Sequence, residues 1–273
     1  MYIDLHTHTT CSDGTLTPEA LVQYAKAKNL KAVAVTDHDT VSGNLRALKE
    51  GETLKVEVIP GVELSAAYTE GSLHILGLFV DSRNKTIKRA TEKLQEKRRE
   101  RNIKILYKLN ELGIEIEESP FAENAYLGRP HIGRALCQLG YVESIDEAFE
   151  KYLKKGASAY VVREKLSEEE TIKAIVTAGG LPVLAHPVTV SHAEKTVNQL
   201  LPLGLRGIEV YYPTHSPEDV HSFQTLAEKY DLFMTGGSDF HGEHKPEIDL
   251  GCMKVPASLL EPLKKEIELN RRG

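Results

Sequence analysis

The sequence has no tryptophan, few cysteines and no long apolar run, and each absence limits what the protein can be. Its three cysteines, Cys11, Cys137 and Cys252, are scattered and form no CxxC pair, so we expect a reduced, cytoplasmic protein without disulfides. No apolar stretch approaches the roughly 18 residues of a membrane-spanning helix. The opening residues, Met-Tyr-Ile-Asp-Leu-His, lack the basic and apolar regions of a signal peptide, so secretion is not expected.

Positive charge and several catalytic motifs are also missing. The 273 residues include 34 Lys and Arg against 40 Asp and Glu, a formal net charge of −6, so we expect no stable binding of duplex DNA through overall charge. The chain contains no Gly-x-Ser-x-Gly elbow, no phosphate-binding P-loop and no GxGxxG. Serine-triad hydrolysis, NTP-driven chemistry and Rossmann cofactor binding therefore lose their support.

The chain alternates short strands with helices. Runs rich in β-branched residues, bounded by Gly, Pro or Asp, lie at residues 2–6, 32–36, 57–62, 73–80, 182–185, 207–211 and 232–235. Most of the intervals between them have a helical period, and Thr17, Ser167 and Ser216 are placed as helix N-caps. This order predicts an α/β fold with a mainly parallel sheet, either open or closed into a barrel. Seven strands favour a barrel smaller than the common eight-stranded type.

Residues 84–164 interrupt the alternation with helical pattern and little strand. We therefore expect a barrel made of residues 1–83 and 165–273, with a helical insert domain at 84–164. Residues 83–104 carry ten basic and three acidic side chains. A solvated helix face is the simpler explanation of that charge, and a basic rim that attracts an anionic substrate is the alternative.

Histidines and carboxylates follow almost every predicted strand. The candidates are His6, His8, Asp13, His38, Glu63, His74, His186, His215, Asp239 and His241. The C-terminal ends of strands are where barrel enzymes and open α/β sheets assemble their sites. In a His-x-His at a strand end, both rings point to the same side because side chains alternate with period two.

These residue types in this pattern predict a metal site. Imidazole and carboxylate bind Zn, Mn or Fe, and one carboxylate can bridge two ions. Two close ions can stabilise the attacking and leaving oxygens of a phosphoryl displacement and supply hydroxide near neutral pH. A hydroxide that bridges the ions is therefore the expected nucleophile, and no side chain is assigned to that role.

The ordered motifs resemble those of the PHP (polymerase and histidinol phosphatase) superfamily. They are His6-Thr-His8-Thr-Thr-Cys-Ser-Asp13-Gly, Thr36-Asp-His38-Asp, Pro60-Gly-Val-Glu63, His74, Ala185-His186-Pro and Ser238-Asp239-Phe-His241. The resemblance implies a distorted (β/α)7 barrel holding two to three divalent ions. It also implies three ligand sets: His6, His8, Glu63 and Asp239; Glu63, His74 and His186; and Asp13, His38 and His241. Many PHP proteins have histidine where this chain has Asp13, so the third set departs from that pattern.

The insert carries a second resemblance. Gly128-Arg129-Pro130-His131-Ile132-Gly133-Arg134-Ala135 is similar to a segment of PHP phosphoesterases that act on nucleoside 3′,5′-bisphosphates and on the 5′ ends of short RNAs. Arg129 offers a planar fork that matches phosphate, and His131 adds a donor. Alternatively, Pro130 only starts a helix and Arg129 is solvated. His215 is placed either to face the site or only to precede the cap Ser216.

The resemblance implies a metal-dependent phosphoesterase. The expected reaction is release of the 3′-phosphate from a nucleoside 3′,5′-bisphosphate, trimming of short 5′-phosphorylated RNA from its 5′ end, or both. Histidinol phosphatase is the alternative enzyme, and a non-catalytic metal-binding PHP module is the alternative of another class. The sequence does not indicate the oligomeric state, the acid for the leaving group or which metals are bound.

Overall fold

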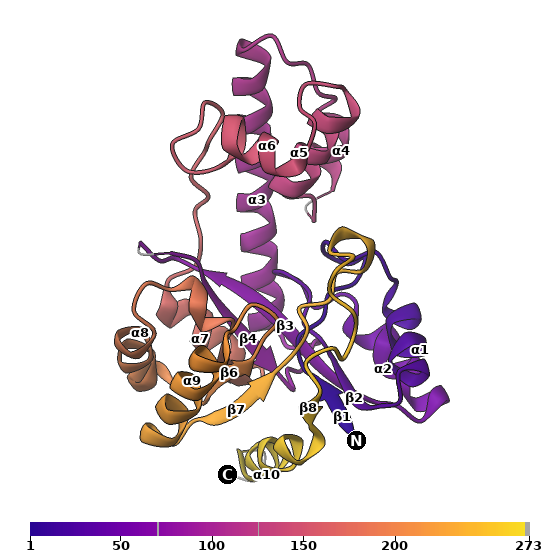
Figure 1. Cartoon of the computed structure of the whole chain (residues 1–273), viewed down its shortest axis with the longest axis vertical. Coiled ribbons are helices and arrows are strands. Elements are labelled where there is room, and N and C mark those ends of the chain that lie inside the picture. Colours follow the sequence, from indigo (N-terminus) through magenta and orange to yellow (C-terminus); the bar gives the residue numbers. More distant parts are fainter. Residues whose placement is uncertain (70, 125, 271–273) are drawn as a thin grey trace. The chain divides into compact units, whose positions relative to one another are not determined.

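A single sheet of eight strands organises the larger part of the chain. The computed structural model describes residues 1–69, 71–124 and 126–270. The strands lie in the order β7-β6-β5-β4-β3-β2-β1-β8 (Figure 1). Their bounds are β1 Tyr2–Asp4, β2 Leu30–Val35, β3 Glu57–Ala66, β4 Leu73–Leu78, β5 Leu181–Leu184, β6 Gly207–Tyr211, β7 Phe233–Gly236 and β8 Val255–Pro256.

All seven predicted strands are present, and the eighth was not predicted. β8 has two residues and pairs antiparallel with β1, and two residues are too few to show an alternating pattern. The segment after β1 meets the end of β7 and the loop that follows it: Leu5 N donates to Gly236 O at 3.1 Å and His8 N to Phe240 O at 2.9 Å. The sheet is therefore a nearly closed barrel.

β4 runs against both of its neighbours, so the sheet is less parallel than the sequence predicted. It pairs antiparallel with β3 and with β5, whereas β2–β3, β5–β6 and β6–β7 are parallel. Only six residues separate Ala66 from Leu73, and a parallel crossover needs a dozen or more. β3 also continues to Ala66, past the predicted end at residue 62, so Glu63 lies inside the strand and not at its end.

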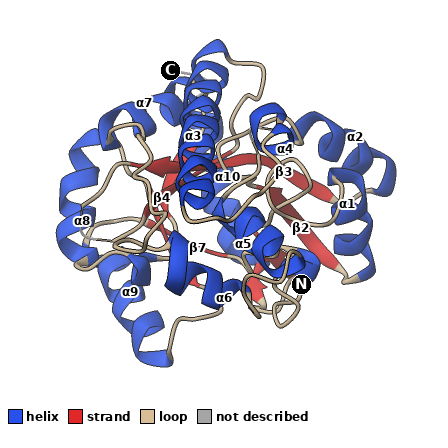
Figure 2. Cartoon of the chain, turned by 90° about the horizontal axis from the view of Figure 1, so that it is seen from above, coloured by secondary structure: helices blue, strands red, loops and turns tan. Residues whose placement is uncertain are grey.

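Helices cover the outside of this sheet (Figure 2). They are α1 Pro18–Ala27, α2 Asn44–Leu54, α7 Glu168–Thr177, α8 Ala193–Leu200, α9 Pro217–Lys229 and α10 Leu260–Asn270. The three predicted N-caps are confirmed: the side chains of Thr17, Ser167 and Ser216 accept hydrogen bonds from the backbone N–H three residues on. Each cap satisfies a donor that a helix start would otherwise leave unpaired.

The described chain divides into two compact units with separate cores. The barrel unit comprises Met1–Glu92 and the chain from Leu166 onward, and the insert unit is Lys93–Lys165. The insert contains the end of α3 Lys85–Glu111, then α4 Ser119–Glu123, α5 Arg129–Gln138, α6 Ile145–Ala148 and the π-turn η1 Phe149–Leu153. Its core includes the fully buried Ile105, Ile132 and Leu136, and the barrel core includes Ile3, Leu76 and Val183.

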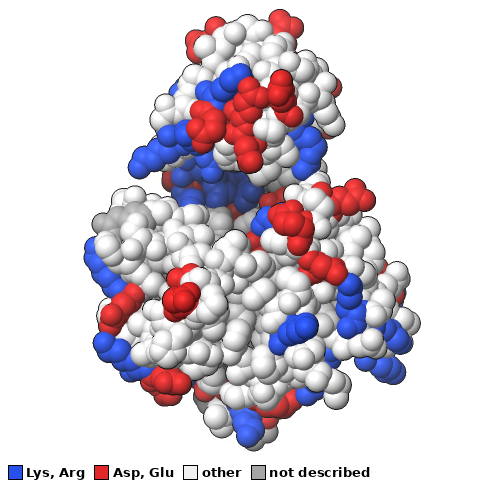
Figure 3. Space-filling view, in the orientation of Figure 1, with Lys and Arg blue, Asp and Glu red and all other residues white. Residues whose placement is uncertain are grey.

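Figure 3 shows charged side chains of both signs in small groups, with broad areas of other residues between them. Several form ion pairs between neighbouring elements, including Arg46–Glu19 at 2.7 Å and Lys229–Glu194 at 2.7 Å. Exposed pairs of this kind stabilise a fold by only about 0.2–1 kcal/mol each. Among the helices described, none is long and apolar enough to cross a membrane.

Candidate metal centre

The nine predicted ligands lie close together in the barrel unit. They come from β3, from β4 and from the loops after β1, β2, β5 and β7, and they are His6, His8, Asp13, His38, Glu63, His74, His186, Asp239 and His241. Six of the nine are buried. His74 is the second residue of β4, and the antiparallel direction of that strand brings its start beside Ser65 near the end of β3. The reversed strand thus delivers its ligand from its N-terminal end.

Glu63 stands at the centre of this cluster, and its two oxygens face different histidines. Oε2 lies 3.2 Å from His6 Nε2, 3.3 Å from His8 Nε2 and 2.9 Å from His38 Nδ1. Oε1 lies 2.6 Å from His74 Nδ1 and 2.9 Å from His186 Nε2. A carboxylate divided in this way is suited to bridge two cations.

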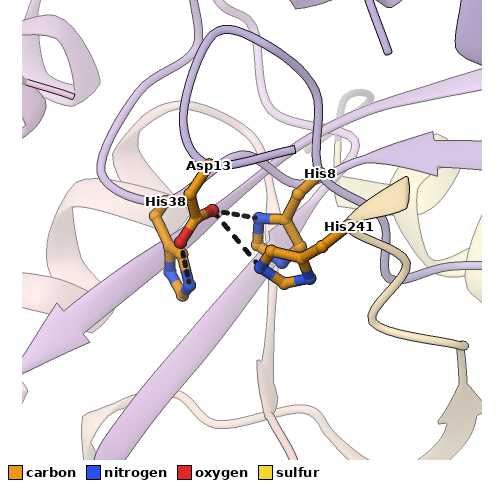
Figure 4. Close-up of side chains that lie close together, drawn as sticks. All are labelled: His8, Asp13, His38 and His241. Atoms are coloured by element: carbon orange, nitrogen blue, oxygen red, sulfur yellow. Dashed lines mark ion pairs between the residues drawn. The ribbon is translucent and has the colours of Figure 1, made fainter. Parts of the chain in front are cut away.

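Asp13 gathers a second set of rings (Figure 4). Its Oδ1 lies 3.3 Å from His241 Nε2 and 3.7 Å from His8 Nδ1, and its Oδ2 lies 3.9 Å from His38 Nε2. These four residues offer ligand atoms within 4.8 Å of one another, as do His6, His8, Glu63 and Asp239, and also His38, Glu63 and His74. The groups share His8, His38 and Glu63, so they form one continuous centre.

The residues fit a metal centre because their buried polar atoms are left without hydrogen bonds. Within the described residues, the buried atoms of the cluster that make no hydrogen bond are His6 Nε2, His8 Nε2, Asp13 Oδ1, His38 Nδ1 and Glu63 Oε2. Leaving a buried polar atom unpaired costs about 1–3 kcal/mol. Bound cations would satisfy these atoms, since imidazole nitrogen and carboxylate oxygen are the ligands that Zn, Mn and Fe use.

Burial and opposite charges compete in setting the pKa values of the cluster. Burial alone would raise the pKa of Glu63, but the His38, His74 and His6 rings around it hold that pKa well below its usual value. Burial alone would lower the pKa of His8, yet Asp239 and Glu63 raise it to about 9. For His74, burial prevails over the pull of Glu63 and lowers the pKa to about 4. Metal binding to His8 must therefore displace a proton.

Glu209 is a buried carboxylate that the sequence analysis did not identify. It lies in β6, is fully buried, and its two oxygens lie 3.0 and 3.2 Å from His6 Nδ1. His186 N donates to its Oε2 at 2.7 Å. A carboxylate on the far nitrogen of a ligand histidine fixes the ring orientation and tautomer. A signal was present, since a charged residue within the strand sequence Gly-Ile-Glu-Val-Tyr is unusual.

Two further side chains hold the outer oxygen of Asp239, and the sequence analysis identified neither of them. The Tyr212 hydroxyl donates to Asp239 Oδ2 at 2.9 Å, and Lys245 Nζ donates to the same atom at 2.6 Å. Asp239 Oδ1 lies instead 3.0 Å from His8 Nε2 and 3.5 Å from His6 Nε2. One oxygen of this carboxylate thus faces the ligand histidines, and the other faces Tyr212 and Lys245.

Asp37 shapes the loop that carries Asp13. It accepts hydrogen bonds from Thr9 N, Thr9 Oγ1 and Ser12 Oγ, each at 2.7 Å. Three bonds from one buried carboxylate fix residues 9–12 against the end of β2. The loop therefore presents Asp13 from a rigid support and not from a mobile tip.

His215 lies next to this centre with one unpaired nitrogen. It is 9% exposed, and its Nδ1 lies 2.8 Å from Val210 O, so Nδ1 carries the proton and donates it. Nε2 is buried and makes no hydrogen bond to the described residues. Burial lowers the pKa of this ring, which leaves Nε2 as an acceptor near neutral pH. The ring centroid is 5.3 Å from that of Tyr212.

Arg129 and His131 lie in the insert unit, at the start of α5. His131 Nδ1 accepts a hydrogen bond from Gly128 N at 3.0 Å and so caps that helix. Arg129 Nη1 donates to Leu153 O at 3.1 Å, and its guanidinium lies 5.5 Å from the centre of the Phe149 ring. The helix begins at Arg129 and Pro130 is its second residue, so Pro130 lies in the first turn, close to the simpler interpretation. The Arg129 side chain, however, is half-buried rather than solvated.

Arginines gather around Arg129 within the insert. Arg101 is 7% exposed, and burial together with the positive charges of Arg163, Arg129 and Arg98 lowers its pKa well below the usual value. Burial also lowers the pKa of Arg129, with Arg98 contributing. Like charges brought together at a half-buried position favour an anion as their partner.

Comparison with known proteins places this site in a family. The PHP domain profile matches residues 4–160. The chain is 31% identical to the 3′,5′-nucleoside bisphosphate phosphatase of Chromobacterium violaceum, over 97% of this chain and 96% of that protein. It is 34% identical to the 5′-3′ exoribonuclease Rnm of Escherichia coli, over 91% and 87%. A solved structure from Bifidobacterium adolescentis, described as a metal-dependent phosphoesterase, superposes with a TM-score of 0.87 at 30% identity, over 96% and 94%. The chain belongs to the PHP domain family.

Proposed function

We propose that this enzyme is a metal-dependent phosphoesterase that acts on nucleoside 3′,5′-bisphosphates, on short 5′-phosphorylated RNA, or on both. The observation that carries the proposal is the set of buried, unpaired ligand atoms around Glu63. By their names, the relatives given above are a 3′,5′-nucleoside bisphosphate phosphatase and a 5′-3′ exoribonuclease, which supports these two substrate classes. Both substrates have a phosphate on the 5′ oxygen of the sugar whose 3′-phosphoester is cut, so one site could serve both.

Two or three divalent ions of Mn, Fe or Zn would be held by these side chains. His6, His8, Glu63 and Asp239 would form one site, and His74 and His186 would share Glu63 in the second. Asp13, His38 and His241 would form the third. When bound, such ions supply Lewis acidity and a hydroxide nucleophile near neutral pH.

The chain's own residues orient the site and bind the substrate. Glu209 fixes the His6 ring, and Asp37 fixes the loop of Asp13. His215 Nε2, an acceptor, would bind a hydroxyl of the sugar, because its bare lone pair is buried and unpaired. In this protonation state His215 has no proton to give to the leaving oxygen, so we assign it to binding.

Arg129 would bind the substrate's second phosphate, and its location in a cluster of arginines supports this role. The guanidinium is pre-positioned by Leu153 O and by the Phe149 ring, and a planar fork matches phosphate. His131 Nδ1 accepts a hydrogen bond from Gly128 N, so this nitrogen is engaged within the insert. The structure gives His131 a capping role in addition to the binding role that we propose.

Turnover of adenosine 3′,5′-bisphosphate by the manganese-reconstituted protein tests the proposal. We expect AMP and inorganic phosphate to appear, EDTA to abolish the reaction, and Glu63→Gln to abolish it as well. Glu57→Gln is the matched control, because Glu57 begins the same strand and pairs with Lys264 at 2.8 Å. Arg129→Ala should raise KM and leave the metal content unchanged. If metal is bound but histidinol phosphate is hydrolysed in place of the nucleotide, the substrate assignment is wrong.

A further inference from the structure

Lys245 brings a cation to the edge of the metal centre. Its Nζ lies 2.6 Å from Asp239 Oδ2, and its side chain is 34% exposed. Among the residues that the structure describes, Asp239 is the side chain to which this ammonium donates a hydrogen bond. A lysine ammonium has three N–H donors, so two of them remain for a group that enters from solvent.

The loop that carries Lys245 is fixed to the loop that carries Asp13. Glu243 N donates to Thr15 Oγ1 at 3.0 Å, and His244 Nδ1 lies 2.7 Å from Asp13 O. Gly242 has a φ of +66°, and a Cβ there would lie 2.0 Å from Thr15 Oγ1. These contacts between the two loops hold Lys245 beside the ligands, in addition to its own pairing with Asp239.

The two oxygens of Asp239 face different partners, and this sets the position of the Lys245 ammonium. Oδ1 faces His6 and His8, the proposed ligands, and Oδ2 faces Lys245. The Lys245 ammonium therefore lies on the outer side of Asp239, away from the position that a metal ion would take between Asp239, His6 and His8. A phosphoryl group bound at the ions would approach this same edge, where its non-bridging oxygens need donors.

We propose that Lys245 is a catalytic residue that donates N–H to a non-bridging oxygen of the phosphoryl group being transferred, while Asp239 Oδ2 tethers the ammonium. The inference rests on the phosphoester chemistry proposed above. Charge on those oxygens is stabilised in the transition state of phosphoryl transfer by preorganised cations. A lysine ammonium supplies such a positive charge at the end of a flexible side chain. Tyr212, the other donor to Oδ2, would keep Asp239 in place when Lys245 turns toward the substrate.

The test compares Lys245→Met with Lys245→Arg and with a control in the same loop. Methionine keeps the length of the side chain and removes the charge, and arginine restores the charge. Lys254→Met is the control, because Lys254 is exposed and lies in the same connection before β8. The readouts are manganese content, the dissociation constant of inorganic phosphate from the manganese-loaded protein by calorimetry, and kcat and KM with adenosine 3′,5′-bisphosphate.

We expect Lys245→Met to bind manganese normally, to bind phosphate about tenfold more weakly, and to lose about 10- to 100-fold in kcat/KM, as expected for one charged hydrogen bond. Lys245→Arg should recover most of both losses, and Lys254→Met should behave as the parent. Two results would overturn the proposal: unchanged phosphate affinity, or loss of manganese with phosphate affinity unchanged once manganese is saturating. Because phosphate binding does not depend on the nucleotide, a wrong nucleotide assignment would leave this test intact.

Discussion

At the residue scale, Glu209 is not one of the nine candidate ligands, yet its replacement should weaken metal binding. It accepts from both His6 Nδ1 and His186 N, and glutamine can offer only one oxygen for these two donors. We expect Glu209→Gln to weaken manganese binding about 10- to 100-fold, measured by competition with a chelator. Glu228→Gln, an exposed site in α9, is the control. Equal manganese affinity in the two variants would contradict the role of Glu209.

The pKa of His8 leads to a prediction about protons. In the metal-free protein, Asp239 and Glu63 raise that pKa to about 9 against the burial that would lower it. Below pH 9 the ring is therefore protonated, and a cation that uses Nε2 must displace the proton. Manganese binding at pH 7.5 should release protons, and the apparent affinity should rise with pH until about pH 9. Calorimetry in buffers of different ionisation enthalpy checks this, and a buffer-independent enthalpy would refute it.

The same shift sets the pH dependence of folding in the metal-free protein. A histidine whose pKa is raised on folding stabilises the fold fully below its unfolded value of 6.5, and that contribution is lost as pH rises toward 9. The chelated protein should thus lose this contribution over the interval in which metal affinity increases. Comparison of Tm with and without EDTA from pH 6 to 9 separates the two effects.

At the element scale, the loop between β1 and α1 depends on Asp37. Asparagine has one acceptor oxygen, so Asp37→Asn cannot keep all the hydrogen bonds from Thr9 and Ser12. The loop should loosen, and the site that uses Asp13 should fail first. We expect bound metal to fall by about one ion per chain while the His6 site stays filled, as measured by atomic spectroscopy. A full complement of metal, or complete loss of it, would show that the loop does not act separately.

The positions of the strands could be predicted from the sequence, but their directions could not. Positions 2–6 and 32–36 are predictable because β-branched runs bounded by turn residues have a distinctive period. The same pattern does not indicate whether neighbouring strands run parallel or antiparallel. The reversal of β4 follows from the short connection between Ala66 and Leu73. The ligand candidates were predictable as a set, because histidines and carboxylates follow almost every strand and the C-terminal ends of such strands meet at one face. Lys245 was not, since only the folded chain brings it to Asp239. For Glu209 the sequence offered a charged residue inside a strand, but its partner His6 is known only from the folded chain.

At the scale of the whole molecule, the chain consists of two units, each with an apolar core of its own. Leu136 lies in the insert core and Leu76 in the barrel core, and both are fully buried. Leu76 pairs with Glu63 across β3 and β4, so its environment is continuous with the ligand cluster. Truncation of each leucine therefore creates a similar cavity in a different unit.

These two truncations should separate stability from metal binding. Leu136→Ala and Leu76→Ala should each cost about 2–5 kcal/mol of unfolding free energy, measured by denaturant titration of the manganese-loaded protein. Leu136→Ala should keep the parent's manganese content, because the nine candidate ligands all lie in the barrel unit. Leu76→Ala should bind manganese more weakly, because the cavity lies beside the strand that carries Glu63. If Leu136→Ala lost manganese as readily as Leu76→Ala, the barrel unit could not be the sole support of the metal centre.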